Sequence, residues 1–178
     1  MQCGRIAYQN PKVVCGCIVA HHEDAGRVLL ARRAIEPCLG RWTVPAGYLE
    51  LGESSQAGAE RETWEEVEAK VTVDGPFAHF DIPVIGQNYY LYRSTLAAPF
   101  TAGAGPETQE SRWFDVKDLP WDELAFSSVR LALQLYIEDL AAGEWAFHQG
   151  VIDKVPGSHP ADPGAFRLVD QLRLPPRR

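Results

Sequence analysis

Three glutamates have a spacing that can do chemistry: Glu62, Glu65 and Glu66 stand at positions i, i+3 and i+4. In a helix each residue turns by about 100°, so the three carboxylates would share one face, within an arc of about 100°. Like charges at these spacings cost a few tenths of a kcal/mol per pair. A hard cation such as Mg²⁺ or Mn²⁺ prefers these oxygen ligands and often completes its shell with phosphate oxygens. The spacing therefore indicates a metal site more than a solvated acidic face.

The charge of the whole chain agrees with this interpretation. Its 24 Asp and Glu outnumber its 17 Lys and Arg, which gives a formal net charge of −7. A nucleic acid or an anionic membrane would need a surplus of basic residues, so the composition argues against both partners. A phosphate compound would then need positive charge from another source, and a divalent metal supplies it.

The elements that must position these residues follow from the sequence pattern. The 178 residues suffice for one domain. Helices are predicted over Ser54–Glu68, which is rich in Ala, Glu and Arg, and over Ser127–Ala142, where apolar residues recur at helical spacing. The class is α+β, or an α/β/α sandwich. Strands are predicted over Val13–Ala20, Val28–Arg33, Trp42–Val44, Val71–Val73, Phe77–Ile82, Asn88–Leu96 and Arg112–Phe114.

A fixed pattern surrounds the glutamates: Gly47, five residues, Glu53, seven residues, then Arg61–Glu66 with the sequence RETWEE. It resembles the Nudix box, the loop–helix–loop signature of the Nudix hydrolases. The resemblance implies the Nudix fold, an α/β/α sandwich around a mixed β-sheet. Two residues depart from the family pattern: Thr63 replaces an aliphatic residue, and Glu68 replaces the glycine that normally ends the helix.

The resemblance also implies roles. Glu62, Glu65 and Glu66 would hold the Mg²⁺ or Mn²⁺ ions that bridge a diphosphate, with a backbone carbonyl beside Gly47 joining the metal shell. Arg61 and Glu53 would form an ion pair that braces the loop. The metals would neutralise the diphosphate and acidify a bound water, which attacks phosphorus. Glu107 and Glu110 follow a Gly-rich loop and are candidates for a general base. For each of them, a role as an ordinary surface glutamate is equally plausible.

The resemblance extends over nearly the whole chain. The sequence is similar to those of the plant and algal chloroplast Nudix enzymes that hydrolyse FAD to FMN and AMP and also accept ADP-ribose. This similarity implies that the protein forms a homodimer and is located in the chloroplast. If it is not in the chloroplast, a cytoplasmic location is expected. The segments that carry the similarity are Tyr8–Lys12, Trp42–Gly47, Asp81–Gln87, Pro120–Ser128 and Tyr136–Pro160.

Those relatives carry an N-terminal zinc ribbon, and Cys3 is all that matches it here. Residues 1–12 are therefore interpreted as its remnant and a lead-in segment, and no zinc is expected because a closed site needs four ligands. Residues 13–145 would form the Nudix domain. Residues 146–178, with prolines and glycines after position 155, are expected to be an irregular extension.

FAD needs a flat apolar slot and contacts to its phosphates. Asp81 and Gln87 are candidates for polar contacts to a base or ribose. Most aromatic residues at such positions belong to a core, and arginines at strand edges are usually solvated. The aromatic candidates are Tyr8, Phe80, Tyr89, Tyr90 and Trp113, and the basic candidates are Arg5, Arg32 and Arg33.

Two other functions fit the sequence less well. One is a diphosphatase that prefers NADH or ADP-ribose. The other is a Nudix-fold binding module without catalysis. Such modules commonly lose carboxylates of the box, whereas Glu53, Glu62, Glu65 and Glu66 are all present. The sequence therefore favours an enzyme.

Overall fold

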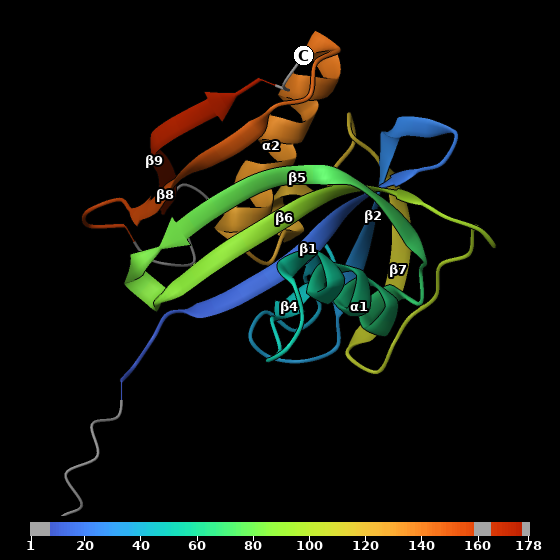
Figure 1. Ribbon diagram of the computed structural model, residues 1–178, viewed down its shortest axis with the longest axis horizontal. Coiled ribbons are helices and arrows are strands. Elements are labelled where there is room, and N and C mark those ends of the chain that lie inside the picture. Colours follow the sequence, from blue (N-terminus) through green and yellow to red (C-terminus); the bar gives the residue numbers. More distant parts are fainter. Residues whose placement is uncertain (1–7, 159–164, 176–178) are drawn as a thin grey trace, which may run out of the picture.

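The computed structural model describes residues 8–158 and 165–175. The fold is built on one nine-stranded sheet with the order β3-β2-β1-β6-β5-β8-β9, in which β4 pairs with β1 and β7 with β2 (Figure 1). β1 and β6 run parallel, as do β5 and β8, so the sheet is mixed. The strands are β1 Lys12–His21, β2 Asp24–Arg33, β3 Trp42–Thr43, β4 Ala46–Tyr48, β5 Val71–Ile82, β6 Gln87–Leu96, β7 Thr108–Asp115, β8 Phe147–Lys154 and β9 Phe166–Leu174.

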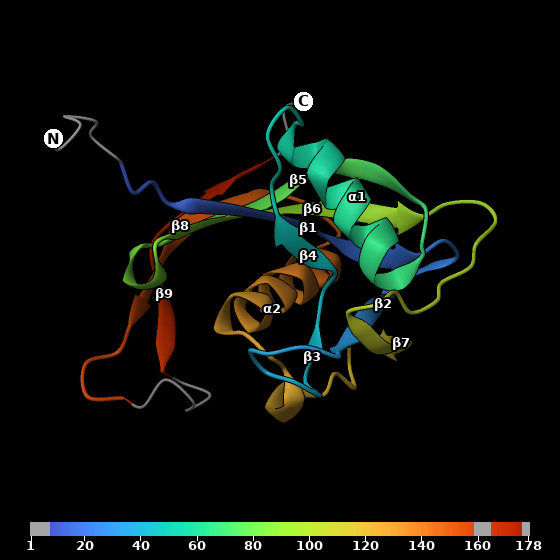
Figure 2. The same ribbon diagram turned by 90° about the horizontal axis from the view of Figure 1, so that it is seen from below.

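The two helices, α1 (Ser55–Val67) and α2 (Ser127–Ala142), cover opposite faces of the sheet. Figure 2 shows α1 on one side of β1 and β6 and α2 on the other. The predicted α/β/α arrangement and α+β class are therefore correct. No helix in residues 8–158 and 165–175 is long and apolar enough to cross a membrane.

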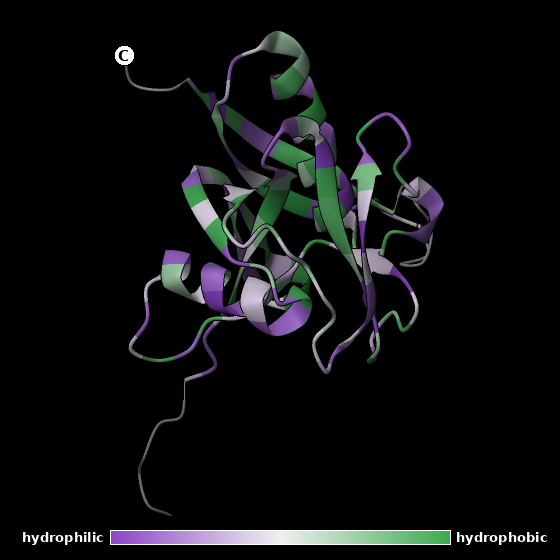
Figure 3. Ribbon diagram, turned by 90° about the vertical axis from the view of Figure 1, so that its right-hand side faces the viewer, coloured by the Kyte–Doolittle hydropathy of each residue, from purple (hydrophilic) through white to green (hydrophobic). Residues whose placement is uncertain are grey.

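Each face of the sheet has its own core because side chains alternate along a strand. Cys15, Cys17 and Val19 of β1 pack with Ala59 of α1. On the other face a larger cluster includes Val14 and Ile18 of β1 together with Phe77, Leu133 and Tyr136. Figure 3 shows hydrophobic residues concentrated in the central strands. The two cores thus hold α1 and α2 against opposite faces of the sheet.

Two elements differ from the sequence prediction. The segments 71–73 and 77–82 form one strand, β5, because register shifts at Gly75 and Pro76 let the chain pass these residues without leaving the sheet. β7 is also longer than the predicted Arg112–Phe114 and pairs along β2.

The prediction that residues 146–178 form an irregular extension is wrong. β8 pairs in parallel with β5, and β9 pairs antiparallel with β8, so the tail extends the sheet by two strands. The prolines and glycines that indicated a loop lie between the strands, and neither strand contains proline.

Candidate active site

Helix α1 and the short strand β4 before it place the acidic residues. The Ser54 hydroxyl caps the helix by accepting the amide N–H of Ala57 at 3.1 Å. At the other end Glu68 adopts the left-handed conformation (φ 49°, ψ 28°), and its N–H donates to the Trp64 carbonyl at 2.8 Å. Glu68 therefore closes the helix as the usual glycine would.

The three glutamates of the acidic face differ in their surroundings. Glu66 is only 8% exposed, and burial raises its pKa to about 8, although the amide N–H of Ala46 donates to its Oε2 at 3.2 Å. Glu62 is partly buried, and this burial also raises its pKa. Glu65 is about half exposed. A cation beside Glu66 and Glu62 would offset the cost of burying their negative charge.

Arg61 ties the acidic face to the preceding loop. Its guanidinium donates to carboxylate oxygens of Glu53, Glu62 and Glu65, each at 2.8 Å, and to the Tyr48 carbonyl at 3.1 Å. These contacts include the predicted ion pair with Glu53. Hydrogen bonds from Arg61 and from the Glu50 amide lower the pKa of Glu53 to about 2. Arg61 thus fixes the direction of three carboxylates.

Gly47 of β4 lies directly against Glu62. A Cβ atom at this position would overlap the Glu62 carboxylate, so only glycine leaves room for it. The absent side chain, the oxygen-only donor set and the buried Glu66 together fit a hard divalent cation. Glu62, Glu65 and Glu66 are the residues that would hold Mg²⁺ or Mn²⁺.

In the arrangement described for residues 8–158 and 165–175, no three acidic, His or Cys side chains converge tightly enough to form a metal cluster. On this face the Nη1 of Arg61 donates to both Glu62 and Glu65.

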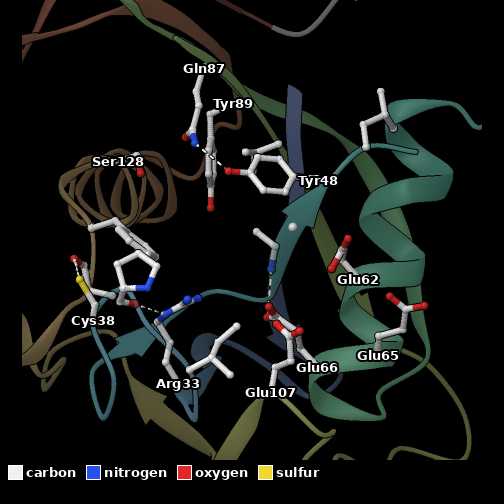
Figure 4. A pocket seen from close by; sticks show the side chains of 18 of the residues that line it. Arg33, Cys38, Tyr48, Glu62, Glu65, Glu66, Gln87, Tyr89, Glu107 and Ser128 are labelled. Carbon is white, nitrogen blue, oxygen red and sulfur yellow. Dashed lines mark hydrogen bonds between the residues drawn. The ribbon is translucent and has the colours of Figure 1, made fainter. Parts of the chain in front are cut away.

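A cavity of about 1350 Å³ opens beside the acidic face and reaches from α1 to α2. Figure 4 shows the carboxylates of α1 on one side, Ser128 of α2 on the other, and Tyr48 and Tyr89 between them. Arg33 and Arg61 are the basic residues that line it in the described part of the chain. The cavity therefore has an acidic end and a larger, mostly apolar end.

The two candidates for the general base lie in different places. Glu107 lines the cavity, and its charge adds to the rise of the Glu66 pKa, so the two carboxyl groups are close (Figure 4). Glu110 lies outside the cavity lining and forms ion pairs with Arg32 at 3.2 Å and Arg112 at 3.0 Å. The geometry favours Glu107 over Glu110.

Among the predicted substrate-binding residues, Gln87, Tyr89 and Arg33 line the cavity. The Gln87 amide donates to the Tyr48 hydroxyl at 3.3 Å across its mouth. Arg33 donates to the Pro37 carbonyl at 2.8 Å, and its guanidinium lies 5.2 Å from the centre of the Phe126 ring. These three residues can contact a ligand bound beside the glutamates.

The other candidates are not brought to the cavity. Phe80 is fully buried in the core under α2, because its position on β5 points it inward. Arg32 is paired with Glu110, and Asp81 is bound by Asn88 and lies near His79.

Three further aromatic candidates also lie elsewhere, and one basic candidate is not tested. Tyr8 is exposed away from the cavity lining, and Arg5 lies outside the described residues. Tyr90 stacks on His79, and Trp113 packs under α1.

Sequence reasoning missed most of the apolar wall. Ile82, Ile85 and Phe126 line the cavity, and they lie in the segments Asp81–Gln87 and Pro120–Ser128 that carried the family resemblance. That signal could have found them. Ile152 and Phe166 also line it, from the strands that were taken for an irregular tail.

The comparison with known proteins matches residues 11–134 to the model of the NUDIX domain. The crystal structure of a NUDIX hydrolase from Nitrosomonas europaea is similar at 41% identity, with a TM-score of 0.80, and the match covers 86% of this chain and 85% of that one.

Two curated relatives are more distant. "Putative nudix hydrolase 1" of Caenorhabditis elegans is 28% identical over 127 residues, which is 67% of this chain and 34% of that protein. "NAD-capped RNA hydrolase NudC" of Vibrio atlanticus (strain LGP32) is 29% identical over 128 residues, 67% of this chain and 44% of that protein. The chain thus spans less than half the length of these relatives.

Proposed function

The chain belongs to the Nudix hydrolase family, and we propose that it hydrolyses the diphosphate bond of FAD to give FMN and AMP. ADP-ribose is proposed as a second substrate. The observation that carries the proposal is one continuous cavity in which the acidic face of α1 meets an apolar wall with tyrosine side chains. A diphosphate that carries large ring systems matches both ends of such a cavity.

The charged residues of the cavity have separate roles in the proposed reaction. Mg²⁺ or Mn²⁺, when bound by Glu62, Glu65 and Glu66, supplies the positive charge that neutralises a diphosphate and makes water more acidic. Arg33 lies on the opposite wall, where its guanidinium can contact a phosphate. Glu107, beside Glu66, would take the proton from the attacking water. The released products carry one phosphate each.

The size of the cavity supports a substrate with two ring systems. Pockets for drug-sized ligands measure roughly 300–1,000 Å³. The cavity of about 1350 Å³ exceeds that range. FAD carries adenine and isoalloxazine rings on either side of its diphosphate, so it can fill more of this volume than ADP-ribose can.

A diphosphatase that prefers NADH is the second candidate. The name of the Vibrio relative gives NAD-capped RNA as its substrate. The cap of that RNA contains the same nicotinamide dinucleotide as NADH. NADH also has two ring systems, but nicotinamide is smaller and more polar than isoalloxazine. The apolar wall formed by Ile82, Ile85 and Ile152 therefore favours FAD over NADH.

A substrate panel tests the proposal directly. FAD, ADP-ribose, NADH and a nucleoside triphosphate are each offered with Mg²⁺ or Mn²⁺, and the products are separated by chromatography. FMN and AMP should form from FAD with the highest kcat/KM of the panel. If NADH or ADP-ribose is turned over much faster than FAD, that compound and not FAD is the preferred substrate.

Dependence on the acidic face needs a matched pair of variants. Glu66→Gln should lower kcat at least about 100-fold, because it removes a charged oxygen ligand from the buried wall. Glu60→Gln, on the same helix but outside the cavity lining, should leave kcat unchanged. Full activity of Glu66→Gln would show that the metal site has been assigned to the wrong residues.

A further inference from the structure

We propose that the apolar end of the cavity binds the isoalloxazine ring of FAD and that Phe166 of β9 determines the preference for this ring. Ile82, Ile85 and Ile152 complete the subsite. The inference rests on the proposed function, since it names the part of the FAD molecule that each end of the cavity receives.

The register of the sheet places this subsite far from the glutamates. Val14 of β1 lies beside Tyr89 of β6, and Ile82 of β5 lies beside Gln87. Further along the sheet, β8 pairs with β5 and β9 with β8. One or two residues from each of these five neighbouring strands line the cavity. Four steps between strands span about 19 Å at roughly 4.8 Å each, so the floor is long enough for an extended dinucleotide.

The chemistry of the wall changes along that floor. Near α1 and β1 the lining residues include Glu62, Glu66 and Arg33, whereas Ile152 and Phe166 stand at the far end. An adenine or nicotinamide ring would leave polar edges unpaired against such a wall, which is costly. The dimethylbenzene edge of isoalloxazine has no hydrogen-bonding group. The apolar end therefore suits this ring better than the others.

Phe166 and Ile85 have the exposure that a contact surface needs. Ile85 is 58% exposed, and Phe166 is partly exposed while it packs against the core cluster that contains Ile152. Water-exposed apolar side chains that line a cavity gain free energy when a flat ring covers them. A phenyl ring held by the core is a fixed surface for stacking, which costs little ordering on binding.

Both β8 and β9 lie after residue 134, where the match to the family domain ends. The acidic end of the cavity thus comes from the shared domain, and part of the apolar end comes from strands outside it. Substrate preference can change through Phe166 without any change in the residues that act on the diphosphate.

The test uses the product FMN as a probe, because it carries the flavin ring and is not turned over. Flavin fluorescence reports its binding to the whole chain in the presence of Mg²⁺, and calorimetry reports the binding of AMP. Phe166→Ala should raise the Kd for FMN about tenfold and leave that for AMP within about twofold. Phe166→Trp, which keeps a flat ring, should retain FMN binding. Leu172→Ala on the same strand, 49% exposed and outside the cavity lining, is the matched control.

Steady-state kinetics form the second arm. Phe166→Ala should lower kcat/KM for FAD about tenfold through KM and leave ADP-ribose within about twofold. Two outcomes would show that Phe166 only supports the fold and would overturn the inference. The first is an equal loss of kcat/KM for FAD and ADP-ribose. The second is a weakening of FMN binding by both Phe166→Trp and Leu172→Ala. If the wild type does not hydrolyse FAD, the proposed function fails by itself, and FMN binding still decides the subsite. Absence of FMN binding would overturn the inference.

Discussion

At the scale of single residues, burial separates carboxylates that look equivalent along the helix. Glu66 is held in the wall, where burial raises its pKa to about 8, whereas Glu65 reaches into solvent. A buried carboxylate stays ionised at neutral pH only when a positive charge compensates it. Arg61 donates to Glu62 and Glu65, whereas the donor to Glu66 is the neutral amide of Ala46. Glu66 is therefore the carboxylate with most to gain from a bound cation.

Gly47→Ala tests whether the space beside Glu62 is functional. The added Cβ overlaps the carboxylate, which is the flexible end of a side chain, so Glu62 should move away while the fold persists. We expect kcat to fall by about 10- to 100-fold with little change in melting temperature. Activity assays and thermal unfolding of the same preparations measure both effects.

A double-mutant comparison identifies the cause of that loss. If the Gly47→Ala substitution acts through Glu62, then adding it to Glu62→Gln should cost nothing further. If the two losses of kcat multiply in the double variant, Gly47→Ala damages some other part of the site.

The acidic end of the site could be predicted from sequence because its chemistry lies in one helix with fixed offsets. The apolar end could not, because it is assembled from five strands whose order is set by long-range pairing. Phe80 and Asp81 were predicted to contact substrate, whereas Ile82, which lies on the same face of β5 as Phe80, lines the cavity. Alternation along the strand separates Asp81 from these two residues, but packing between distant segments decides which of Phe80 and Ile82 reaches the cavity.

At the scale of elements, the end of α1 carries strain. Glu68 is a non-glycine residue at φ 49°, and its carboxylate stands at the negative end of the helix dipole. Gly103 lies close to the same side chain, and a Cβ there would overlap the Glu68 carboxylate. The loop before Glu107 is thus fitted around a residue that weakens the helix end.

Glu68→Gly should raise the free energy of unfolding by about 0.5–1 kcal/mol, because glycine adopts this conformation without a steric cost. Chemical denaturation measures the change. Glu68→Ala removes the carboxylate but keeps the Cβ strain, so it should give the smaller gain. A gain of equal size from both variants would assign the effect to charge and not to the backbone.

Most elements followed from local signals, but β8 and β9 did not. The helix Ser127–Ala142 has the bounds that its apolar spacing predicted, since α2 packs by one regular stripe. In the sequence, a segment rich in proline and glycine lies between β8 and β9 and dominates the composition of the tail. Their place at the end of the sheet depends on the parallel pairing of β8 with β5, a contact between distant parts of the chain.

At the scale of the whole molecule, one buried carboxylate joins the tail to the rest of the fold. Asp139 of α2 accepts the amide of Ala146 at 2.8 Å, contacts His148 Nε2 of β8 at 2.9 Å and accepts Arg173 of β9 at 3.1 Å. It is almost fully buried. Asp139 therefore fixes the two strands that carry Ile152 and Phe166 against α2.

Asp139→Asn should lower the free energy of unfolding by about 3 kcal/mol, because it leaves the buried His148 and the partly exposed Arg173 without their charged partner. Urea unfolding at neutral pH measures the loss. Glu138→Gln, exposed on the same helix, should change stability by less than about 0.5 kcal/mol. Equal stability of Asp139→Asn and the wild type would show that the tail is held by apolar packing alone.

The same carboxylate predicts how stability depends on pH. Burial alone would raise its pKa, but the hydrogen bonds from Ala146, His148 and Arg173 lower it below the ordinary value of 3.8. Below that value the unfolded chain binds a proton that the folded chain does not, so unfolding becomes easier as pH falls. The stabilisation is complete above the ordinary pKa and disappears as pH falls through the lowered one. From about pH 5 to about pH 3 the wild type should therefore lose stability more steeply than Asp139→Asn, and parallel profiles would remove Asp139 as the cause.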